Sequence, residues 1–104
     1  MTDSDERLIT IYEKICMDII ESKPNMLIPW YIMASYAYYV QDDPILSDGV
    51  FDRLINRLTD QYDNLEHQHK DFVKKDALKA GTYLGDYPTR TEDVLKQLRR
   101  EHGR

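Results

Sequence analysis

Hydrophobic positions recur at steps of three and four residues along most of the chain, which is the spacing of one face of an α-helix. The first stripe of this kind ends before Pro24, and proline disfavours helical geometry in the residue that precedes it. We therefore expect a first helix over about residues 4–22. Its apolar stripe consists of Leu8, Ile11, Tyr12, Ile15, Cys16, Ile19 and Ile20.

Two further stripes lie on either side of a turn. Pro29 suits the first turn of a helix, because its missing N–H would have had no partner there, and the apolar and aromatic positions continue to about Val40. The "QDDP" that follows, ending at Pro44, is typical of a turn. Ser47 then predicts the N-cap of a third helix. The apolar stripe of that helix is Phe51, Leu54, Ile55, Leu58 and Tyr62.

The pattern weakens after Asp63. The segment from there to Gly81 is compatible with a helix, and a last helix is expected over about residues 90–101. Sustained alternation of apolar and polar residues, the mark of a half-buried strand, is absent from the sequence. We predict an all-α fold of four to five helices in a single domain, residues 1–104, with a core of about 4–73 and a C-terminal extension of about 74–104.

Charge and cysteine content argue against several classes of function and location. Residues 1–63 carry 12 acidic and 5 basic side chains, so this part repels a phosphate backbone, which argues against direct nucleic-acid binding. A lone cysteine, Cys16, cannot form an internal disulfide, and its place in an apolar stripe predicts an inert core residue. No apolar run approaches the length of a membrane span, and the acidic start does not resemble a signal peptide, so we expect a cytoplasmic protein.

The stretch "YAYYVQDDPILSDGVFDRLINRL" carries the most specific pattern in the chain. It resembles the N-terminal Ia domain of bacterial NAD-dependent DNA ligases, in which a tyrosine-rich helix ending in "YYV" or "YHV" is followed by D-x-P and then by "SDAEYDRLMREL". This resemblance implies the small helical Ia fold, which closes over the nicotinamide mononucleotide (NMN) half of NAD. The matching positions are Tyr36, Tyr38, Tyr39, Val40, Asp42, Pro44, Ser47, Asp48, Asp52, Arg53, Leu54 and Leu58.

Carried over position by position, the resemblance implies that NMN or NAD is bound by Tyr38, Tyr39, Asp48, Phe51 and Asp52. Aromatic rings and carboxylates also suit a pyridinium cation with a carboxamide and a ribose diol, through cation–π attraction and hydrogen bonding. One position departs from the family, which usually has tyrosine where this chain has Phe51. The ring is kept there, and a hydroxyl able to orient the ligand is lost.

Each of these residues also has a structural interpretation. Asp48 follows an N-cap, where the helix dipole favours a carboxylate in any protein. Phe51 lies on the apolar stripe of the third helix. Tyr38 and Tyr39 point about 100° apart on a helix, so that one can be buried while the other faces a cleft. Only the combined spacing favours a ligand pocket over simple helix packing.

A ligase also needs a nucleotidyl-transfer lysine, found in that family within a K-x-D-G motif, and none of the 104 residues forms this motif. We therefore expect a domain that binds NMN or NAD without sealing DNA by itself, as a separate binding module or as part of a split ligase. The alternative is a protein interaction module on a ligase scaffold that has lost the nucleotide. Its partner would be a ligase adenylation domain or a host factor, and a phage source is consistent with either interpretation.

Two other kinds of site are less favoured. Hydrolysis of NAD by paired carboxylates is a third possibility, but the sequence fixes neither a nucleophile nor a lid. His67 and His69 would point to opposite sides of a helix, which is poor geometry for one metal ion unless the segment is extended. We expect them to lie on a solvated face.

Overall fold

The computed structural model of the chain describes residues 3–73, 78 and 87–101. These residues contain helices and turns but no strand, which confirms the all-α prediction. The observed ends of the first and last helices agree with the expected ranges to within one residue. The α-helices of the described part are α1 (Asp3–Ser22), α2 (Leu27–Ser35), α3 (Asp48–Gln61) and α5 (Thr91–Glu101).

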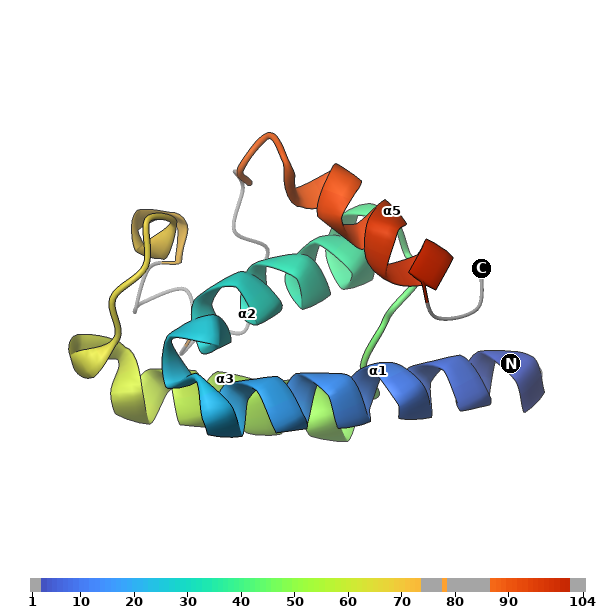
Figure 1. Ribbon diagram of the computed structural model, residues 1–104, viewed down its shortest axis with the longest axis horizontal. Helices are drawn as coiled ribbons and strands as arrows, with labels where there is room; N and C mark the ends of the chain where they lie inside the picture. The colour runs from blue at the N-terminus through green and yellow to red at the C-terminus, as the bar shows by residue number, and fades with distance from the viewer. Residues whose placement is uncertain (1–2, 74–77, 79–86, 102–104) are drawn as a thin grey trace.

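Helix α2 lies at the centre of the molecule, between α5 on one side and α3 on the other (Figure 1). Eight of its nine residues are buried, including Trp30, Tyr31 and Ser35. A helix that is hydrophobic on every side is stable only when other elements surround it. The density of apolar residues after Pro24 therefore explains why this segment became the core helix.

The start and end of α2 differ from the expected helix over Pro29–Val40. A 3₁₀ turn (Pro24–Met26) leads directly into the helix, which begins at Leu27, two residues before Pro29. At the other end, Tyr36–Val40 continue as a π-helical turn, in which the N–H of Gln41 donates to the carbonyl oxygen of Tyr36 at 3.1 Å. The chain is thus helical to Val40 as predicted, with a wider last turn.

The buried face of α1 is narrower than its apolar stripe. Tyr12, Cys16 and Ile20 are fully buried, whereas Ile11 is 43% exposed. The residues at three- and four-residue steps therefore form a central buried row with partly exposed flanks. The core prediction holds for Cys16, whose thiol pKa is raised to about 12 because burial disfavours the thiolate.

The prediction of a helix after Asp63 is wrong for the described residues up to Val73, which form two short 3₁₀ turns joined by irregular chain. Leu65 is extended and buried, and the Tyr62 hydroxyl donates to the carbonyl oxygen of Val73 at 2.7 Å. The Lys70 ammonium donates to the carbonyl oxygen of Leu65 at 2.9 Å. These contacts override a weak helical pattern, and the predicted continuation to Gly81 falls outside the described residues.

Helix α5 closes the far side of α2. Leu95 is fully buried, and the Arg99 guanidinium lies 3.4 Å from the carboxylate of Asp43. The same side chain donates to the Asp43 carbonyl oxygen at 2.7 Å, which ties α5 to the turn between α2 and α3. The hydroxyls of Ser35 and Tyr87 lie 2.8 Å apart, in hydrogen-bond contact. The described residues of the C-terminal extension from Tyr87 onwards thus pack against the same core.

Candidate functional site

The N-terminus of α3 is held by its own cap and by a residue of α1. Ser47 has extended backbone geometry, and its hydroxyl accepts a hydrogen bond from the N–H of Val50 at 3.4 Å, as the N-cap prediction requires. The Ser47 hydroxyl donates in turn to the Glu13 carboxylate at 2.7 Å, and the Ser47 N–H donates to the same oxygen at 3.2 Å. The first turn of α3 is therefore fixed in place against α1.

Tyr38 and Tyr39 lie in the π-helical turn at the end of α2. In a regular α-helix, Tyr38 and Tyr39 would diverge by about 100°. In the wider turn, both rings border the same hollow, and their centroids lie 4.9 Å apart in an edge-to-face arrangement. The two side chains differ in burial, since Tyr38 is half-buried and Tyr39 is 37% exposed, and both line the hollow.

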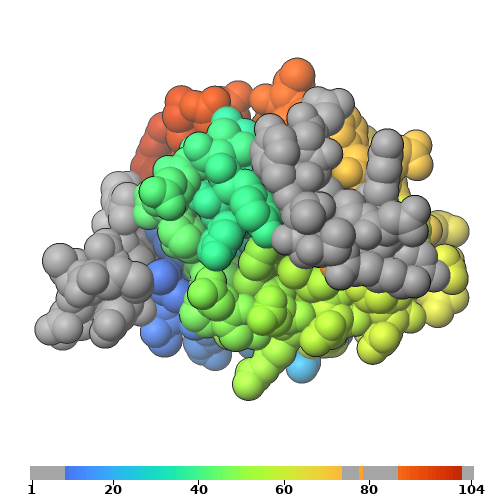
Figure 2. Space-filling view, turned by 180° about the vertical axis from the view of Figure 1, so that it is seen from behind, coloured from blue at the N-terminus to red at the C-terminus, as the bar shows by residue number. Residues whose placement is uncertain are grey.

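The five residues that the sequence singles out meet around one pocket, between the end of α2 and the first two turns of α3. We call it the aromatic pocket, and its volume is about 260 Å³. Figure 2 shows the face of the molecule on which these two segments lie beside each other at the surface. Ile55 is a sixth lining residue, which the sequence had placed only in the apolar stripe. The complete lining is Tyr38, Tyr39, Asp48, Phe51, Asp52 and Ile55.

A chain of aromatic contacts runs from the core to this pocket. The ring of Phe51 stacks on Tyr31 at 5.8 Å between centroids and on Tyr38 at 5.7 Å, and Tyr38 meets Tyr39. Phe51 is only 6% exposed, so it supports the wall of the pocket and offers little surface of its own. The aromatic area open to a ligand comes from Tyr38 and Tyr39.

The charged groups of the aromatic pocket are two exposed carboxylates, Asp48 and Asp52, one helical turn apart. Partial burial, the neighbouring Tyr38 and the carboxylate of Asp52 together raise the pKa of Tyr39. The Tyr39 phenol is therefore neutral at physiological pH and can donate a hydrogen bond. Among the described residues that line this pocket, none is Lys or Arg.

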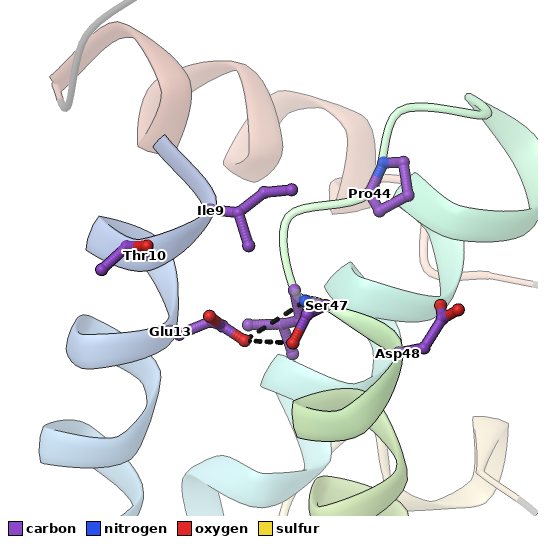
Figure 3. A pocket seen from close by; sticks show the side chains of 7 residues that line it. Ile9, Thr10, Glu13, Pro44, Ser47 and Asp48 are labelled. Atoms are coloured by element: carbon purple, nitrogen blue, oxygen red, sulfur yellow. Dashed lines mark hydrogen bonds between the residues drawn. The ribbon is translucent and has the colours of Figure 1, made fainter. Parts of the chain in front are cut away.

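A second hollow of about 370 Å³ opens on the other side of Asp48, and we call it the α1–α3 pocket. Figure 3 shows Glu13 on α1 reaching towards Ser47, while the side chain of Asp48 points away from both. Sequence spacing could not reveal this pocket, because Glu13 and Ser47 are 34 residues apart. Its lining is Ile9, Thr10, Glu13, Pro44, Leu46, Ser47 and Asp48.

The turn between the two helices is shaped by its acidic residues. Asp42 has a positive φ of 51°, a conformation that aspartate tolerates better than most residues. The N–H of Asp43 donates to the carbonyl oxygen of Ala37 at 2.9 Å, and its carboxylate faces Arg99 of α5. Asp42 and Pro44 thus form the turn, as their sequence pattern indicates, and the pattern gave no sign of the contact from α5.

The remaining candidates do not form a site. The rings of His67 and His69 lie 5.4 Å apart in the irregular turn that precedes the 3₁₀ turn Lys70–Phe72, so the helical premise that placed them on opposite sides was wrong. Burial and the neighbouring His69 lower the pKa of His67. Within the part of the chain that the structure describes, no three His, Cys, Asp or Glu side chains converge on a possible metal position, and no helix is long and apolar enough to cross a membrane.

Comparison with known proteins supports the resemblance seen in the sequence. A DNA ligase of Alcanivorax borkumensis is 39% identical over 67 residues, which are 64% of this chain and 8% of the relative. The chain thus spans a small fraction of that enzyme's length, and no solved structure gives a significant match. Residues 25–77 match the family described as "DNA ligase-like, N-terminal NAD+-binding domain". The match includes every residue of the aromatic pocket and leaves α1 and α5 outside it, and on this basis the chain belongs to that family.

Proposed function

We propose that the aromatic pocket binds the NMN half of NAD, or NMN itself, through Tyr38, Tyr39, Asp48, Phe51 and Asp52. The observation that carries this proposal is the convergence of all five residues on one pocket. Family membership supports it independently, because the family is described by NAD+ binding.

The chemistry of the pocket suits this ligand. The half-buried ring of Tyr38 and the exposed ring of Tyr39 offer faces on which a flat pyridinium cation can stack. Asp48 and Asp52 supply acceptors for the ribose hydroxyls and balance the positive charge of the ring. The neutral phenol of Tyr39 adds a donor for a carboxamide or ribose oxygen. Phe51 holds Tyr38 in position through their stacked rings.

We further propose that the chain does not seal DNA by itself and acts with a separate polypeptide, as one part of a split ligase. Its 104 residues contain no K-x-D-G motif, which the resemblance gives as the source of the lysyl-adenylate. The partner would then be an adenylation domain, which would approach the ligand from the open side of the aromatic pocket.

A second candidate is a protein interaction module that has lost the nucleotide. It is favoured by the exposure of two large side chains that are adjacent in sequence, Tyr39 of the pocket lining at 37% and Val40 at 44%. Such a surface suits a partner protein as well as a ligand. In this case Phe51, which lacks the usual hydroxyl, would mark the loss of nucleotide recognition.

Titration calorimetry of the purified chain with NMN and NAD separates the two candidates. Binding should be saturable, and Asp48→Ala and Tyr38→Ala should each weaken it about tenfold, through the loss of an acceptor and of a stacking surface. No heat and no spectral change at millimolar ligand would remove the nucleotide proposal. Retention of a protein partner by a variant that carries both Asp48→Ala and Asp52→Ala would then favour the interaction module.

A further inference from the structure

The α1–α3 pocket combines apolar walls with an acidic edge. Its volume of about 370 Å³ is larger than that of the aromatic pocket and is sufficient for a small ligand or a side chain. Ile9, Pro44 and Leu46 supply the apolar surface, and Glu13 and Asp48 supply the charged groups. Among the described residues that line it, none is Lys or Arg. The group that fits such a pocket has an apolar body and a positive charge.

The Glu13 carboxylate is held in position and is only half used. One oxygen, Oε2, accepts from the hydroxyl and from the N–H of Ser47, at 2.7 and 3.2 Å. Both dashed lines in Figure 3 start from this oxygen. The other oxygen, Oε1, accepts no hydrogen bond from the described residues. Because Ser47 already fixes the side chain, little rotamer freedom remains to be lost when a cation pairs with Oε1.

The negative charge of this pocket is not balanced from within. Neither Glu13 nor Asp48 forms an ion pair in the part of the chain that the structure describes. Arg53 and Arg57 are on α3 and line neither pocket. Residues 1–63 carry 12 acidic and 5 basic side chains, so the surrounding field also attracts cations. A cation brought by another molecule would therefore meet an unpaired carboxylate.

The donor set favours an organic cation over a metal ion. Calcium and magnesium need about six oxygen ligands, and no three His, Cys, Asp or Glu side chains of the described residues converge on one position. The side chain of Asp48 points away from Glu13, so it adds charge at the rim and does not complete a cage (Figure 3). An arginine side chain suits the pocket better. Its stem packs on apolar surface, and its weakly hydrated guanidinium donates to carboxylates.

We infer that the α1–α3 pocket is a docking site for an arginine-bearing segment of a protein partner. The guanidinium pairs with Glu13, and an apolar neighbour of the arginine packs on Ile9 and Pro44. This inference goes beyond the proposed function, because it requires no nucleotide, and it assigns a role to α1, which lies outside the family match. Since Asp48 lines both pockets, a partner bound here also lies beside the aromatic pocket.

The test is an NMR titration of the full chain, without NMN, with two dipeptides. The probes are acetyl-leucyl-arginine amide and the same peptide with citrulline, which has a similar shape and no charge. We expect saturable shifts at the amides of Ile9, Thr10 and Ser47, with the arginine peptide binding about three- to tenfold more tightly at low salt. The ratio should approach one in about 0.5 M salt, where exposed charges are screened.

The Glu13→Gln variant assigns the preference for arginine to one residue. The substituted amide keeps an oxygen that accepts from Ser47 and removes the negative charge, so the two peptides should bind about equally. Glu21→Gln is the matched control, because Glu21 is exposed on the same helix and lines neither pocket. Asp52→Asn is a second control, because Asp52 lines only the aromatic pocket, where an arginine could stack on tyrosine. Both controls should keep the preference.

Shifts at the α1–α3 pocket, with a preference for arginine that is lost in Glu13→Gln and kept in both controls, support the inference. It is overturned by the absence of shifts at about 10 mM peptide, a concentration that detects even millimolar affinity. Equal binding of the two peptides, shifts centred on Tyr38 and Tyr39, or a preference that survives Glu13→Gln also overturns it. A separate NMN titration of the same protein tests the proposed function, so the failure of one leaves the other standing.

Discussion

The two pockets that share Asp48 differ in the origin of their walls. The aromatic pocket is built from residues 38–55, which are continuous in sequence and lie inside the family match. The α1–α3 pocket takes Ile9, Thr10 and Glu13 from a helix outside that match. The first therefore follows from a local pattern, whereas the second exists only because α1 packs against the start of α3.

This difference separates the residues that line the aromatic pocket from the helices that hold them in place. Side chains suited to contact a nicotinamide ring come from the segment that the family shares, and the surroundings of that segment come from helices outside the family match. Glu13 holds Ser47 from one side, and Arg99 holds Asp43 from the other. Both ends of the turn between α2 and α3 are therefore held by helices outside the family match.

The largest expected effect on ligand affinity comes from a substitution that alters the aromatic pocket alone. Asp52→Ala removes a carboxylate that lines only this pocket, and we expect NMN affinity to fall about tenfold or more, as measured by calorimetry. The thermal midpoint should be unchanged, because Asp52 is exposed. The control is Asp60→Ala, an exposed position on the same helix that lines neither pocket. An equal loss of affinity in the control would mean that general charge, and not the pocket, governs binding.

The next prediction tests whether α1 belongs to the same core. Burial raises the Cys16 pKa from 9.0 to about 12, so the thiol must stay protonated in the folded chain. Its contribution to stability is complete below pH 9 and is lost as the pH rises towards 12. The free energy of unfolding in urea should therefore fall by about 2 kcal/mol more between about pH 8 and pH 10.5 than in Cys16→Val. Equal losses in the two proteins would place α1 outside the packed core.

Removal of the Ser47 N-cap should weaken the start of α3, which lies between the two pockets. Ser47→Ala deletes the hydroxyl that accepts from Val50 and donates to Glu13, and the free energy of unfolding should fall by about 1 kcal/mol. Urea denaturation measures this change. Ser22→Ala, at the exposed end of α1, is the control and should cost much less. A cost in Ser47→Ala no larger than in the control would show that the cap does not hold α3.

A tyrosine at position 51 would restore the hydroxyl that the family usually has in the aromatic pocket. Phe51→Tyr should tighten NMN binding about three- to tenfold if the added hydroxyl reaches the pocket that Phe51 lines. Phe72→Tyr adds the same group to a ring that lines neither pocket, and should have no effect on affinity. Weaker binding in Phe51→Tyr would instead show that the hydroxyl is buried without a partner among the stacked rings.

The smallest expected effect is a change in stability at the start of α3, the helix that contributes residues to both pockets. A Cβ added at Gly49 would meet no atom within 4 Å, so Gly49→Ala fits without strain. Alanine reduces the freedom of the unfolded chain and favours the helix, and we expect a gain of about 0.5 kcal/mol in unfolding free energy with unchanged NMN affinity. A loss of stability would indicate that the first turn of α3 needs glycine.

Much of the fold and the lining of the aromatic pocket follow from sequence because they depend on short spacings. A helix end at Pro24, a helix start at Ser47 and the apolar face of α3 each depend on residues that are close in sequence. The predicted helix ends were therefore close to the observed ones. The segment after Asp63 was wrongly predicted as helix because its conformation is fixed by contacts such as that of Tyr62 with Val73. No local pattern encodes these contacts.

The surroundings of the site escaped prediction for the same reason. From the sequence pattern, Glu13 is an ordinary polar position of the first helix. Arg99 belongs to a basic run that the same pattern places on a solvated face. Their contacts with Ser47 and Asp43 join residues 34 and 56 positions apart. The π-helical turn that contains Tyr38 and Tyr39 was also not predicted.

The most direct test of the central claim is an NMR titration of the full chain with NMN, which reports both affinity and position. We predict saturable shifts of backbone amides concentrated at Tyr38, Tyr39, Asp48 and Asp52, with smaller changes at Ile9 and Thr10 in the α1–α3 pocket. Absence of any shift at millimolar NMN, or shifts centred on the α1–α3 pocket, would contradict nicotinamide recognition by the aromatic pocket.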